Sequence, residues 1–529
     1  MALLYLADVP YRELCDRVSI AAISIFAVSI LVQIVSVFLA SATYRNFCRE
    51  HTGFYKASPG LRQRIIYMRL PVPWPSETTY YLLDHTNMRK LFARSPQLDA
   101  FGLARRLHYA VWGVPPLKYK EIFREGAKQI HRELSSKKLG PVSKSFERVI
   151  LREIETLRND LGSQGRLVPL HSTFYRFAYG GNMEAIFGPD LPVEETRIAV
   201  QYFALSIGAL NTTPSLPLFP TSWRNRIVPT TRRGLAKREF LHDALTKWRR
   251  DGGLETCSDA WRSIMQVVLD KNVDSVSADA WANMVLFGFQ GNTPEQPGWF
   301  WLYILQSPKL WEAIKAEVDR LPPGSLLGTE FRKVTPLMHS AIHETLRLAT
   351  AIFAGREATN AATIPGCDKT FPKGSLIRIM SRASTFDAKI WGDNPESFKG
   401  DRFMNNEALY LEELVFGGGV SACPGRFFAQ SELELLAAHL IRNFDFDVKS
   451  LAIHQKLPPE SKYLELGSPL QNVEDTCEII DLDGTRLVGK YPGLLDAENC
   501  ELQQLCPRTS VRLTISRHGE HKWVVIPSE

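Results

Sequence analysis

Three kinds of feature are absent from this 529-residue sequence, and each absence removes a class of protein. No repeat or low-complexity tract is long enough to indicate disorder, and 45% hydrophobic with 23% charged residues is typical of a globular chain. There is no basic stripe with interleaved aromatic residues, and the net charge is only +6, so nucleic acid is not an expected partner. The 8 cysteines include no Cys-x-x-Cys pair and no zinc-like spacing. This pattern favours free thiols in a reducing compartment, although an even number of cysteines is also compatible with disulfide bonds.

Charged residues are also missing from one long stretch near the N-terminus. Residues 18–44 read VSIAAISIFAVSILVQIVSVFLASATY, and about 25 helical residues cover roughly 38 Å, against about 30 Å for a bilayer core. A cleaved signal would have a shorter apolar core, and a buried core helix rarely stands at a chain end with nothing to cover it. We therefore expect a transmembrane anchor, with residues 1–17 in the lumen and the bulk of the chain in the cytosol.

The rest of the chain predicts one mainly helical domain. Residues 45–78 form a basic linker whose closely spaced prolines favour a stiff, extended connector. From about residue 80 to 350 the periodicity is helical, in segments such as KEIFREGAKQIHRELSS and SPKLWEAIKAEVDRL. Segments with strand-like alternation are short and late, namely GSLIRIMS, CEIIDLDG, SVRLTISR and KWVVIP. We expect a mainly α domain with minor β over residues 79–529, without an internal boundary.

Residues 416–426, FGGGVSACPGR, combine three successive glycines with a cysteine directly before Pro-Gly. Pro424 suits the first position of a helix continuing through RFFAQSELELLAAHLIRNF. The sulfur of Cys423 would then lie at the N-terminus of that helix, where backbone N–H groups favour thiolate over thiol. The glycines, including Gly419 and Gly425, permit positive φ angles and the close approach of a flat ligand. A structural cysteine or a disulfide is the competing interpretation.

The spacing of this loop resembles a known haem-binding signature. Phe416, Gly419, Cys423 and Gly425 stand at the relative positions of Phe-x-x-Gly-x-Arg-x-Cys-x-Gly in the cytochrome P-450 superfamily. The sequence departs from that pattern at Ser421, where Arg or His is usual and would help to neutralise a haem propionate. The resemblance implies the cytochrome P-450 fold and a haem b cofactor whose iron is bound by the Cys423 thiolate.

Two segments upstream match the same family in the expected order. In HSAIHETLRLA, Glu344 and Arg347 are three residues apart on one helix, which by itself predicts only a common solvated ion pair. The family resemblance implies more, because there such a pair joins an arginine of a later segment and braces the cysteine loop. That arginine would be Arg402, in ESFKGDRF.

Other residues of this region are candidates for binding the cofactor or a metal. Arg356, in LATAIFAGREATN, is the candidate partner of a haem propionate, and a second partner is expected in the helix KEIFREGAKQIHREL. His339 and His343 are four apart, as zinc ligands on a helix can be. No third ligand or catalytic glutamate stands at the required spacing, so zinc is the weaker interpretation of that helix.

The segment WANMVLFGFQGNTPEQPGWFWLYIL resembles the family's oxygen-activation helix, whose usual pattern is Ala/Gly-Gly-x-Asp/Glu-Thr. Aligning Gly288 with the first position puts Gly291 at the acid and Asn292 at the alcohol. Two prolines directly afterwards are expected to kink the helix. Because an amide is not an acid, we expect Thr293, or a water held by Asn292, to deliver protons. The Gln-Gly-Asn run resembles the branch of sterol 7α-hydroxylases and prostacyclin synthase, which holds both oxygenases and isomerases.

The resemblance implies a monooxygenase that inserts one oxygen atom from O2 into a lipophilic substrate, either terpenoid, steroid-like or polyketide, in specialised metabolism. It would sit in the endoplasmic reticulum membrane and draw electrons from NADPH–cytochrome P-450 reductase docked on the cysteine side, with cytochrome b5 as a second donor. The altered acid–alcohol pair leaves a haem-thiolate isomerase or dehydratase of a peroxide open. A membrane-anchored haem-binding or lipid-binding protein without catalysis is a third alternative. From about residue 450 the chain fits the family poorly, and two hairpins are expected in this atypical extension.

Overall fold

The computed structural model describes most of the chain between residues 66 and 481. The described residues are 66–68, 79–82, 84–93, 95–114, 116–161, 166–212, 229–271, 274–350, 352, 354–365, 370–379, 381–404, 406–447 and 476–481. The expected anchor at residues 18–44 and the last expected hairpin lie outside them. Within the described residues, no helix is both long and apolar enough to cross a membrane.

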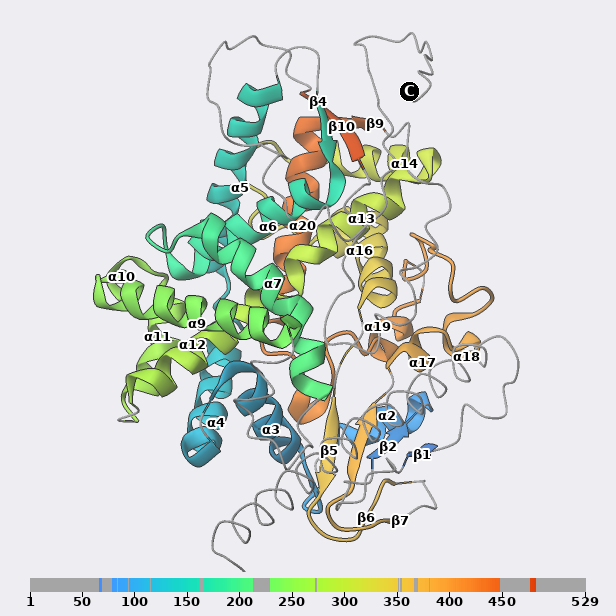
Figure 1. Ribbon diagram of the computed structural model, residues 1–529. Coiled ribbons are helices and arrows are strands. Elements are labelled where there is room, and N and C mark those ends of the chain that lie inside the picture. The colour runs from blue at the N-terminus through green and yellow to red at the C-terminus, as the bar shows by residue number, and fades with distance from the viewer. Residues whose placement is uncertain are drawn as a thin grey trace, which may run out of the picture.

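Helices make up most of the described structure (Figure 1). They are α2 (His85–Leu91), α3 (Ala100–Trp112), α4 (Pro116–Glu133), α5 (Gly140–Leu161), α6 (Leu170–Phe187), α7 (Val193–Thr212), α9 (Pro229–Arg250), α10 (Gly253–Thr256), α11 (Asp259–Leu269), α12 (Ser275–Gln290), α13 (Gln296–Leu305), α14 (Pro308–Val318), α15 (Phe331–Val334), α16 (Pro336–Ala349), α17 (Ser381–Thr385), α18 (Ala388–Trp391), α19 (Ala408–Glu412) and α20 (Arg426–Asn443). Two 3-10 turns are η3 (Thr293–Glu295) and η4 (Gly419–Ser421).

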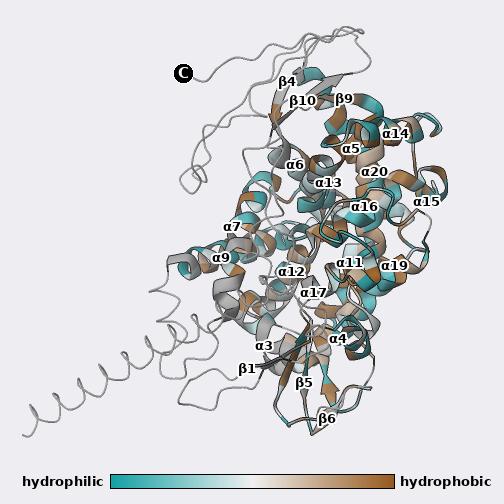
Figure 2. Ribbon diagram, turned by 90° about the vertical axis from the view of Figure 1, so that its right-hand side faces the viewer, coloured by the Kyte–Doolittle hydropathy of each residue, from teal (hydrophilic) through white to brown (hydrophobic). Residues whose placement is uncertain are grey.

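Three small sheets complete the part of the fold that the structure describes. The five-stranded sheet has the order β1 (Ile66–Met68), β2 (Thr79–Leu82), β8 (Leu376–Ile379), β5 (Gly355–Ala358), β3 (Leu98–Asp99). The three-stranded sheet has the order β4 (Arg166–Pro169), β10 (Thr476–Asp481), β9 (Phe444–Asp447), and β6 (Ala362–Thr363) pairs with β7 (Thr370–Phe371). Every pairing is antiparallel except β2 with β8. The two larger sheets lie at opposite ends of the molecule (Figures 1 and 2).

The helices α5, α6, α13, α16 and α20 pack together in the centre of the molecule. Every residue of α13 except Tyr303 is buried, as expected of a helix that is apolar on nearly all sides. The Trp301 ring of α13 stacks on Phe174 of α6, with centroids 4.9 Å apart, and lies 4.2 Å from Phe446 of β9. Most other helices carry both polar and apolar residues along their length (Figure 2). The ring contacts of Trp301 join the central helices to the three-stranded sheet.

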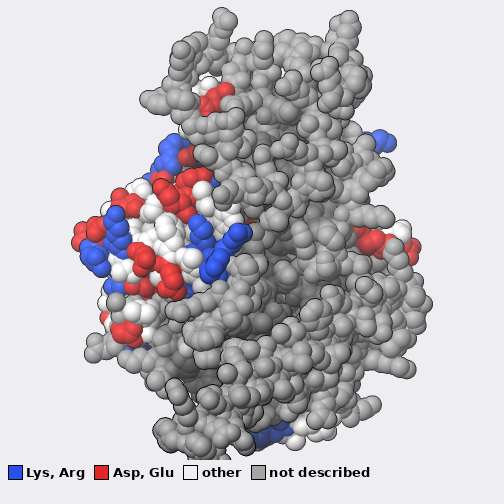
Figure 3. Space-filling view, viewed as in Figure 1, with Lys and Arg blue, Asp and Glu red and all other residues white. Residues whose placement is uncertain are grey.

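Charges of both signs are interspersed on the described surface of α9, α10 and α11 (Figure 3). Arg238 pairs with Glu239, and Arg262 pairs with Asp259. That part of the described surface therefore carries no large patch of a single sign.

The predicted mainly helical architecture with minor β structure is confirmed. Of the strand-like segments, GSLIRIMS contains β8 and CEIIDLDG overlaps β10, whereas the other two lie outside the described residues. The sequence analysis missed strands earlier in the chain, notably β2 and β4. Each is only four residues long, and each is completed by a partner about 300 residues away in the chain, so local alternation carried too little signal.

Candidate active site

The cysteine loop connects α19 to α20 and is fixed by its own backbone. The Cys423 N–H donates to the carbonyl oxygen of Phe416 at 2.8 Å. Gly417 and Gly419 adopt positive φ angles of 69° and 52°, which other residues rarely adopt. A Cβ at Gly419 would lie only 2.2 Å from the carbonyl oxygen of Phe92, so this glycine is also required by close backbone packing. Two of the glycines thus have the positive φ expected of this loop.

The surroundings of the Cys423 sulfur act in opposite directions on its charge. Burial raises the pKa of this thiol, while hydrogen bonds from the backbone N–H groups of Gly425 and Arg426 and the Arg426 charge lower it by less. The expectation that the helix N-terminus leaves the thiolate favoured is therefore wrong for the cysteine alone. A cation bound at the sulfur would reverse the balance. The helix begins at Arg426 and not at Pro424, because Gly425 is its N-cap and accepts from the N–H of Ala429 at 2.9 Å.

The C-terminal end of α4 lies against the cysteine loop. His131 forms a hydrogen bond with the backbone of Ala422, and Leu134, just beyond the helix, packs on Gly425. Burial and the nearby Arg426 charge lower the pKa of His131, and the contact with Ala422 opposes them. A partner for the cofactor was expected somewhere in this helix, but no sequence pattern distinguished His131 from its neighbours.

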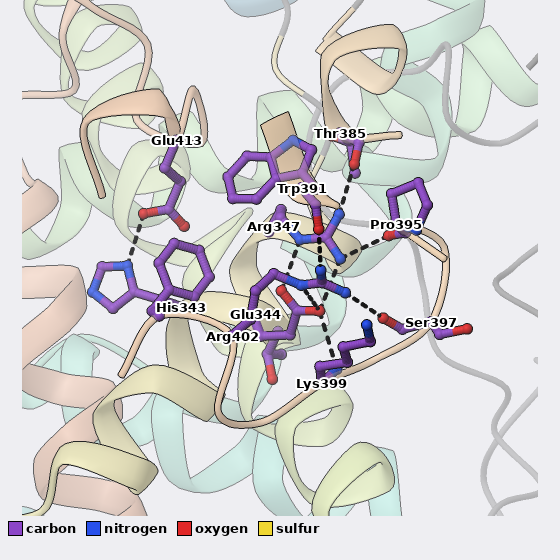
Figure 4. Close-up of polar contacts among 12 residues, drawn as sticks. His343, Glu344, Arg347, Thr385, Trp391, Pro395, Ser397, Lys399, Arg402 and Glu413 are labelled. Atoms are coloured by element: carbon purple, nitrogen blue, oxygen red, sulfur yellow. Dashed lines mark hydrogen bonds and ion pairs between the residues drawn. The ribbon is translucent and has the colours of Figure 1, made fainter. Parts of the chain in front are cut away.

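Glu344, Arg347 and Arg402 meet in one buried cluster (Figure 4). The Glu344 carboxylate accepts from Arg347 Nε at 2.7 Å and Nη2 at 2.8 Å, and from Arg402 Nε at 2.8 Å. It also accepts from the backbone N–H of Lys399 at 3.1 Å. Glu344 is 0% exposed and Arg347 is 2% exposed, so the solvated surface pair that spacing alone predicts is wrong.

The two arginines also fix loops that the sequence places far away. Arg347 donates to the carbonyl oxygens of Thr385 at 2.6 Å and Pro395 at 2.8 Å, and Arg402 donates to that of Ser397 at 2.9 Å. One carboxylate and two guanidinium groups thereby tie α16 to the segment between α17 and α19. That segment leads through α19 into the cysteine loop.

The histidines of α16 each have a separate carboxylate partner. His339 Nδ1 lies 2.6 Å from Glu434 of α20. His343 Nδ1 lies 2.7 Å from Glu413, just before the cysteine loop, and Figure 4 shows this second pair. Over the described ranges, no group of three His, Cys, Asp or Glu side chains could hold a metal ion. The weaker zinc interpretation therefore finds no support there, and the histidines serve as further ties between α16 and its neighbours.

Arg356 lies on β5 and is 2% exposed. Its Nη1 donates to the carbonyl oxygen of Gly355 at 2.8 Å, whereas Nη2 has no hydrogen-bond partner among the residues that the structure describes. Burial lowers the pKa of this guanidinium to about 10, and Asp99 only partly opposes the shift. A buried cation with an unused donor is costly unless an anion completes it. This geometry is suited to a carboxylate ligand such as a propionate.

The central helix was expected to kink at the two prolines, and the structure instead divides it into separate elements there. The N–H of Gly291 donates to the carbonyl oxygen of Phe287 at 2.7 Å and closes α12, after which η3 and α13 follow. Pro294 lies in the first turn of η3 and Pro297 in the first turn of α13. At such positions the missing N–H of proline costs no helical hydrogen bond.

One face of α12 is open. Gly288 is exposed and Met284, one turn earlier, is half-buried, while the other residues after the first two of this helix are buried. A Cβ at Gly288 would meet nothing within 4 Å, whereas one at Gly291 would lie 2.4 Å from the Phe287 ring. Asn292 and Thr293 are half-buried just beyond this face. The position aligned with the family's acid thus has no room for a carboxylic side chain without displacing the ring.

These features fit a planar, iron-containing group with carboxylate substituents. The buried thiol with two backbone donors could hold the iron, and Arg356 could hold a propionate. The open face at Gly288 leaves room for the ring system. The site therefore suits haem b better than a structural disulfide, and Cys423 is a free cysteine.

Comparisons with known proteins identify the same family. A sequence model of the family Cytochrome P450 matches residues 124–466. Cytochrome P450 94C1 of Arabidopsis thaliana is 28% identical over 358 residues, which cover 61% of this chain and 70% of the relative. The (+)-menthofuran synthase of Mentha piperita is 26% identical over 419 residues, covering 73% and 82%. A human 7-alpha-hydroxycholest-4-en-3-one 12-alpha-hydroxylase is 28% identical over 209 residues, covering 35% and 42%. The chain belongs to the cytochrome P450 family, whose members bind haem b through a cysteine thiolate, and it is an oxidoreductase of the monooxygenase type.

Proposed function

We propose that this protein inserts one oxygen atom from O2 into a lipophilic small molecule, with Cys423 as the axial ligand of haem b. The observation that carries this proposal is the geometry of the cysteine loop. Its sulfur is met by the backbone N–H groups of Gly425 and Arg426, which would stabilise the thiolate once iron binds. Bound haem supplies the activation of O2 that protein side chains cannot provide.

The other site residues have supporting tasks in this proposal. Arg356 would bind one haem propionate through its unused Nη2 donor. The cluster of Glu344, Arg347 and Arg402 would keep the cysteine loop in place without touching the haem. Phe416 and Gly419 shape the loop, since Phe416 packs on the main core. Thr293, or a water held by Asn292, would pass protons towards the open face of α12 at Gly288.

The substrate class is inferred from the relatives and from the apolar character of α12. The relatives include a 7-alpha-hydroxycholest-4-en-3-one 12-alpha-hydroxylase and an abscisic acid 8'-hydroxylase, which support hydroxylation of a small lipophilic molecule. We propose a terpenoid, steroid-like or polyketide substrate in specialised metabolism. A membrane anchor at residues 18–44, with the catalytic domain on the cytosolic side of the endoplasmic reticulum, would suit a substrate that dissolves in lipid. Electrons would come from NADPH–cytochrome P-450 reductase, with cytochrome b5 as a second donor.

The decisive experiment is the spectrum of the reduced protein with carbon monoxide. We expect the strongly red-shifted Soret band of thiolate coordination in the wild-type protein and in Cys257→Ser, which changes a buried free cysteine outside the site. Cys423→Ser should lose this band. A wild-type spectrum without the red shift, or retention of it in Cys423→Ser, would refute the assignment.

A haem-thiolate isomerase or dehydratase is the second candidate, favoured by Gly291 and Asn292 at the positions of the family's acid and alcohol. The two functions differ in their need for electrons. Purified protein that converts a lipid hydroperoxide without reductase and NADPH would support the isomerase. Product formed only with O2, NADPH and reductase would support the monooxygenase.

A further inference from the structure

Two consecutive glutamates stand directly before the cysteine loop, and each one contacts a histidine of a different helix. Glu412 is the last residue of α19, and Glu413 follows it with extended backbone angles, φ −71° and ψ 121°. Glu412 Oε2 lies 2.7 Å from Nε2 of His85 in α2, and Glu413 Oε2 lies 2.7 Å from Nδ1 of His343 in α16. Because an ionised carboxylate can only accept, the histidine nitrogen donates in each pair. The chain that enters the cysteine loop is therefore held by both α2 and α16.

The histidine of α2 has a second partner. His85 is 5% exposed, and its Nδ1 lies 2.5 Å from Oγ of Ser384 in α17. Arg89, one turn after His85, donates to the other oxygen of Glu412 at 2.6 Å. The Ser384 hydroxyl can donate to a neutral imidazole, so both nitrogens of His85 are used at once. Three helices, α2, α17 and α19, thus meet at one buried imidazole.

The other end of α2 packs against the cysteine loop itself. A Cβ at Gly418 would lie 3.0 Å from the ring of Phe92, the C-cap of α2, and a Cβ at Gly419 would lie 2.2 Å from its carbonyl oxygen. Between these contacts, Leu414 is buried in the same hydrophobic cluster as Phe92, whereas Phe416 packs against the main core. The segment that enters the loop therefore runs along the boundary between the two cores.

A small cavity lies beside Glu413 at this boundary. Its lining includes Glu413, Ser381, Ser384 and Arg347, and its volume of about 10 Å³ is enough for the centre of one water molecule. The Glu413 side chain is 6% exposed, and its Oε1 has no hydrogen-bond partner among the residues that the structure describes. The Arg347 charge disfavours a cation in this cavity, and the Glu413 carboxylate, seen beside Arg347 in Figure 4, disfavours an anion. A neutral water is the occupant that these charges allow.

We propose that one buried water bridges Glu413 Oε1 and Ser384 Oγ in this cavity. It would donate one hydrogen to each oxygen, while the Ser384 hydroxyl donates to His85. The water completes a chain of hydrogen bonds from α19 through α2 and α17 to α16, which runs Glu412, His85, Ser384, water, Glu413 and His343. None of these residues belongs to the Glu344 cluster. The inference rests on the proposed function, in which the cysteine loop carries the axial ligand of haem.

The members of this chain are positioning residues, because they act on the ligand through the backbone. Glu413 is followed within three residues by Phe416, whose carbonyl oxygen accepts from the N–H of Cys423 at 2.8 Å. If the segment between them loosens, this bond is released and the loop can move while the helices stay folded. Loss of thiolate coordination before unfolding is therefore the expected sign of a broken chain.

The first test looks for the water directly. A crystal structure of the full-length, haem-loaded protein, at a resolution that shows ordered waters, should contain one water within hydrogen-bond distance of both Glu413 Oε1 and Ser384 Oγ. An empty cavity, or another protein group bonded to Oε1, would overturn the proposal.

The second test compares the loss of the thiolate spectrum with the loss of the fold. The full-length, haem-loaded protein is held in moderate denaturant, and the carbon monoxide spectrum and tryptophan fluorescence are followed in parallel. His85→Leu and His343→Leu should lose the thiolate band about 10-fold to 100-fold faster than the wild type while the fluorescence stays native, as expected for a lost hydrogen bond to a charged group. His343→Asn should restore the wild-type rate, because its amide N–H can replace Nδ1.

The matched control is His439→Leu. His439 is 1% exposed and its Nε2 lies 2.7 Å from Glu147 Oε1, so it also belongs to a buried histidine–glutamate pair, but one that joins α20 to α5. This variant should lose the thiolate band only together with the native fluorescence. If His85→Leu and His343→Leu behave in the same way, their role is merely structural and the proposal is wrong. Ser384→Ala, which removes only a hydroxyl, should also accelerate the loss of the band and serves as the milder variant if the leucine variants fold poorly.

The outcomes separate this inference from the proposed function. A wild-type protein without the thiolate spectrum refutes the function, and the presence or absence of the water in the crystal structure then decides the chain. A wild-type protein with that spectrum, in which His85→Leu, His343→Leu and Ser384→Ala all keep the wild-type rate, supports the function and refutes the positioning chain.

Discussion

Replacing Glu344 with glutamine removes the carboxylate that Arg347 and Arg402 share. The wild-type carboxylate accepts three guanidinium N–H groups at 2.7 to 2.8 Å and one backbone N–H at 3.1 Å. Glutamine has nearly the same shape but only one acceptor oxygen, and its NH2 group would face guanidinium donors. Two buried cations would then remain without a counter-charge. Breaking a buried ion pair from one side costs about 3–5 kcal/mol, and the near-zero exposure of Glu344 places this site in that range.

The prediction is checked by guanidinium chloride unfolding of the full-length, haem-loaded protein, followed by tryptophan fluorescence. At about 1.4 kcal/mol per factor of ten, the unfolding equilibrium of Glu344→Gln should shift by about two to four powers of ten. Loss of the cluster should also loosen the cysteine loop, so the variant should lose its thiolate spectrum at lower denaturant concentration than the wild type.

The control is Glu155→Gln on α5. Glu155 also pairs with an arginine three residues later, Arg158, at 2.6 Å, but its side chain is 51% exposed. Exposed pairs of this kind contribute about 0–1 kcal/mol. The reasoning is refuted if Glu344→Gln is no more destabilising than Glu155→Gln, because burial would then not be what makes the cluster stabilising.

Three further predictions follow from single contacts. Arg356→Gln should weaken haem retention by about 10-fold to 100-fold, as measured by haem transfer to an acceptor protein. The unfolding of the haem-free protein should stay unchanged, because Nη2 lacks a partner within the described residues. An equal loss of haem retention and of haem-free stability would contradict a propionate role. Burial alone would raise the pKa of Glu147, but hydrogen bonds led by that from His439 lower it below its ordinary value of 4.5, so the stability that it contributes should be present above that pH and be lost as the pH falls further. Glu147→Gln should flatten this part of the pH–stability curve, and an unchanged curve would contradict the assignment. In the haem-free protein, Gly288→Ala should be neutral or stabilise the fold by up to about 1 kcal/mol, whereas Gly291→Ala should destabilise it by about 1–3 kcal/mol, as thermal unfolding would measure. Equal effects of the two substitutions would contradict the packing.

The sequence by itself determined the chemistry of the cysteine loop and the helical class of the fold. The glycine spacing around Cys423 is a local backbone requirement, and two of its glycines do have positive φ angles. A disturbance of the helix after Gly291 was equally predictable, because an interior proline kinks or ends a helix through its own backbone geometry.

Tertiary structure decided what no local pattern carries. Spacing alone predicts that Glu344 and Arg347 form a surface pair. The fold instead buries them with Arg402, which lies 58 residues after Glu344. Glu432 of α20 is, by its sequence alone, one polar residue of a helix, and only the fold buries it to 2% exposure. Spacing along a helix indicates which residues share a face. Burial and pairing, however, depend on segments that meet only when the whole chain packs. Burial and pairing in turn set the charge states on which the site depends.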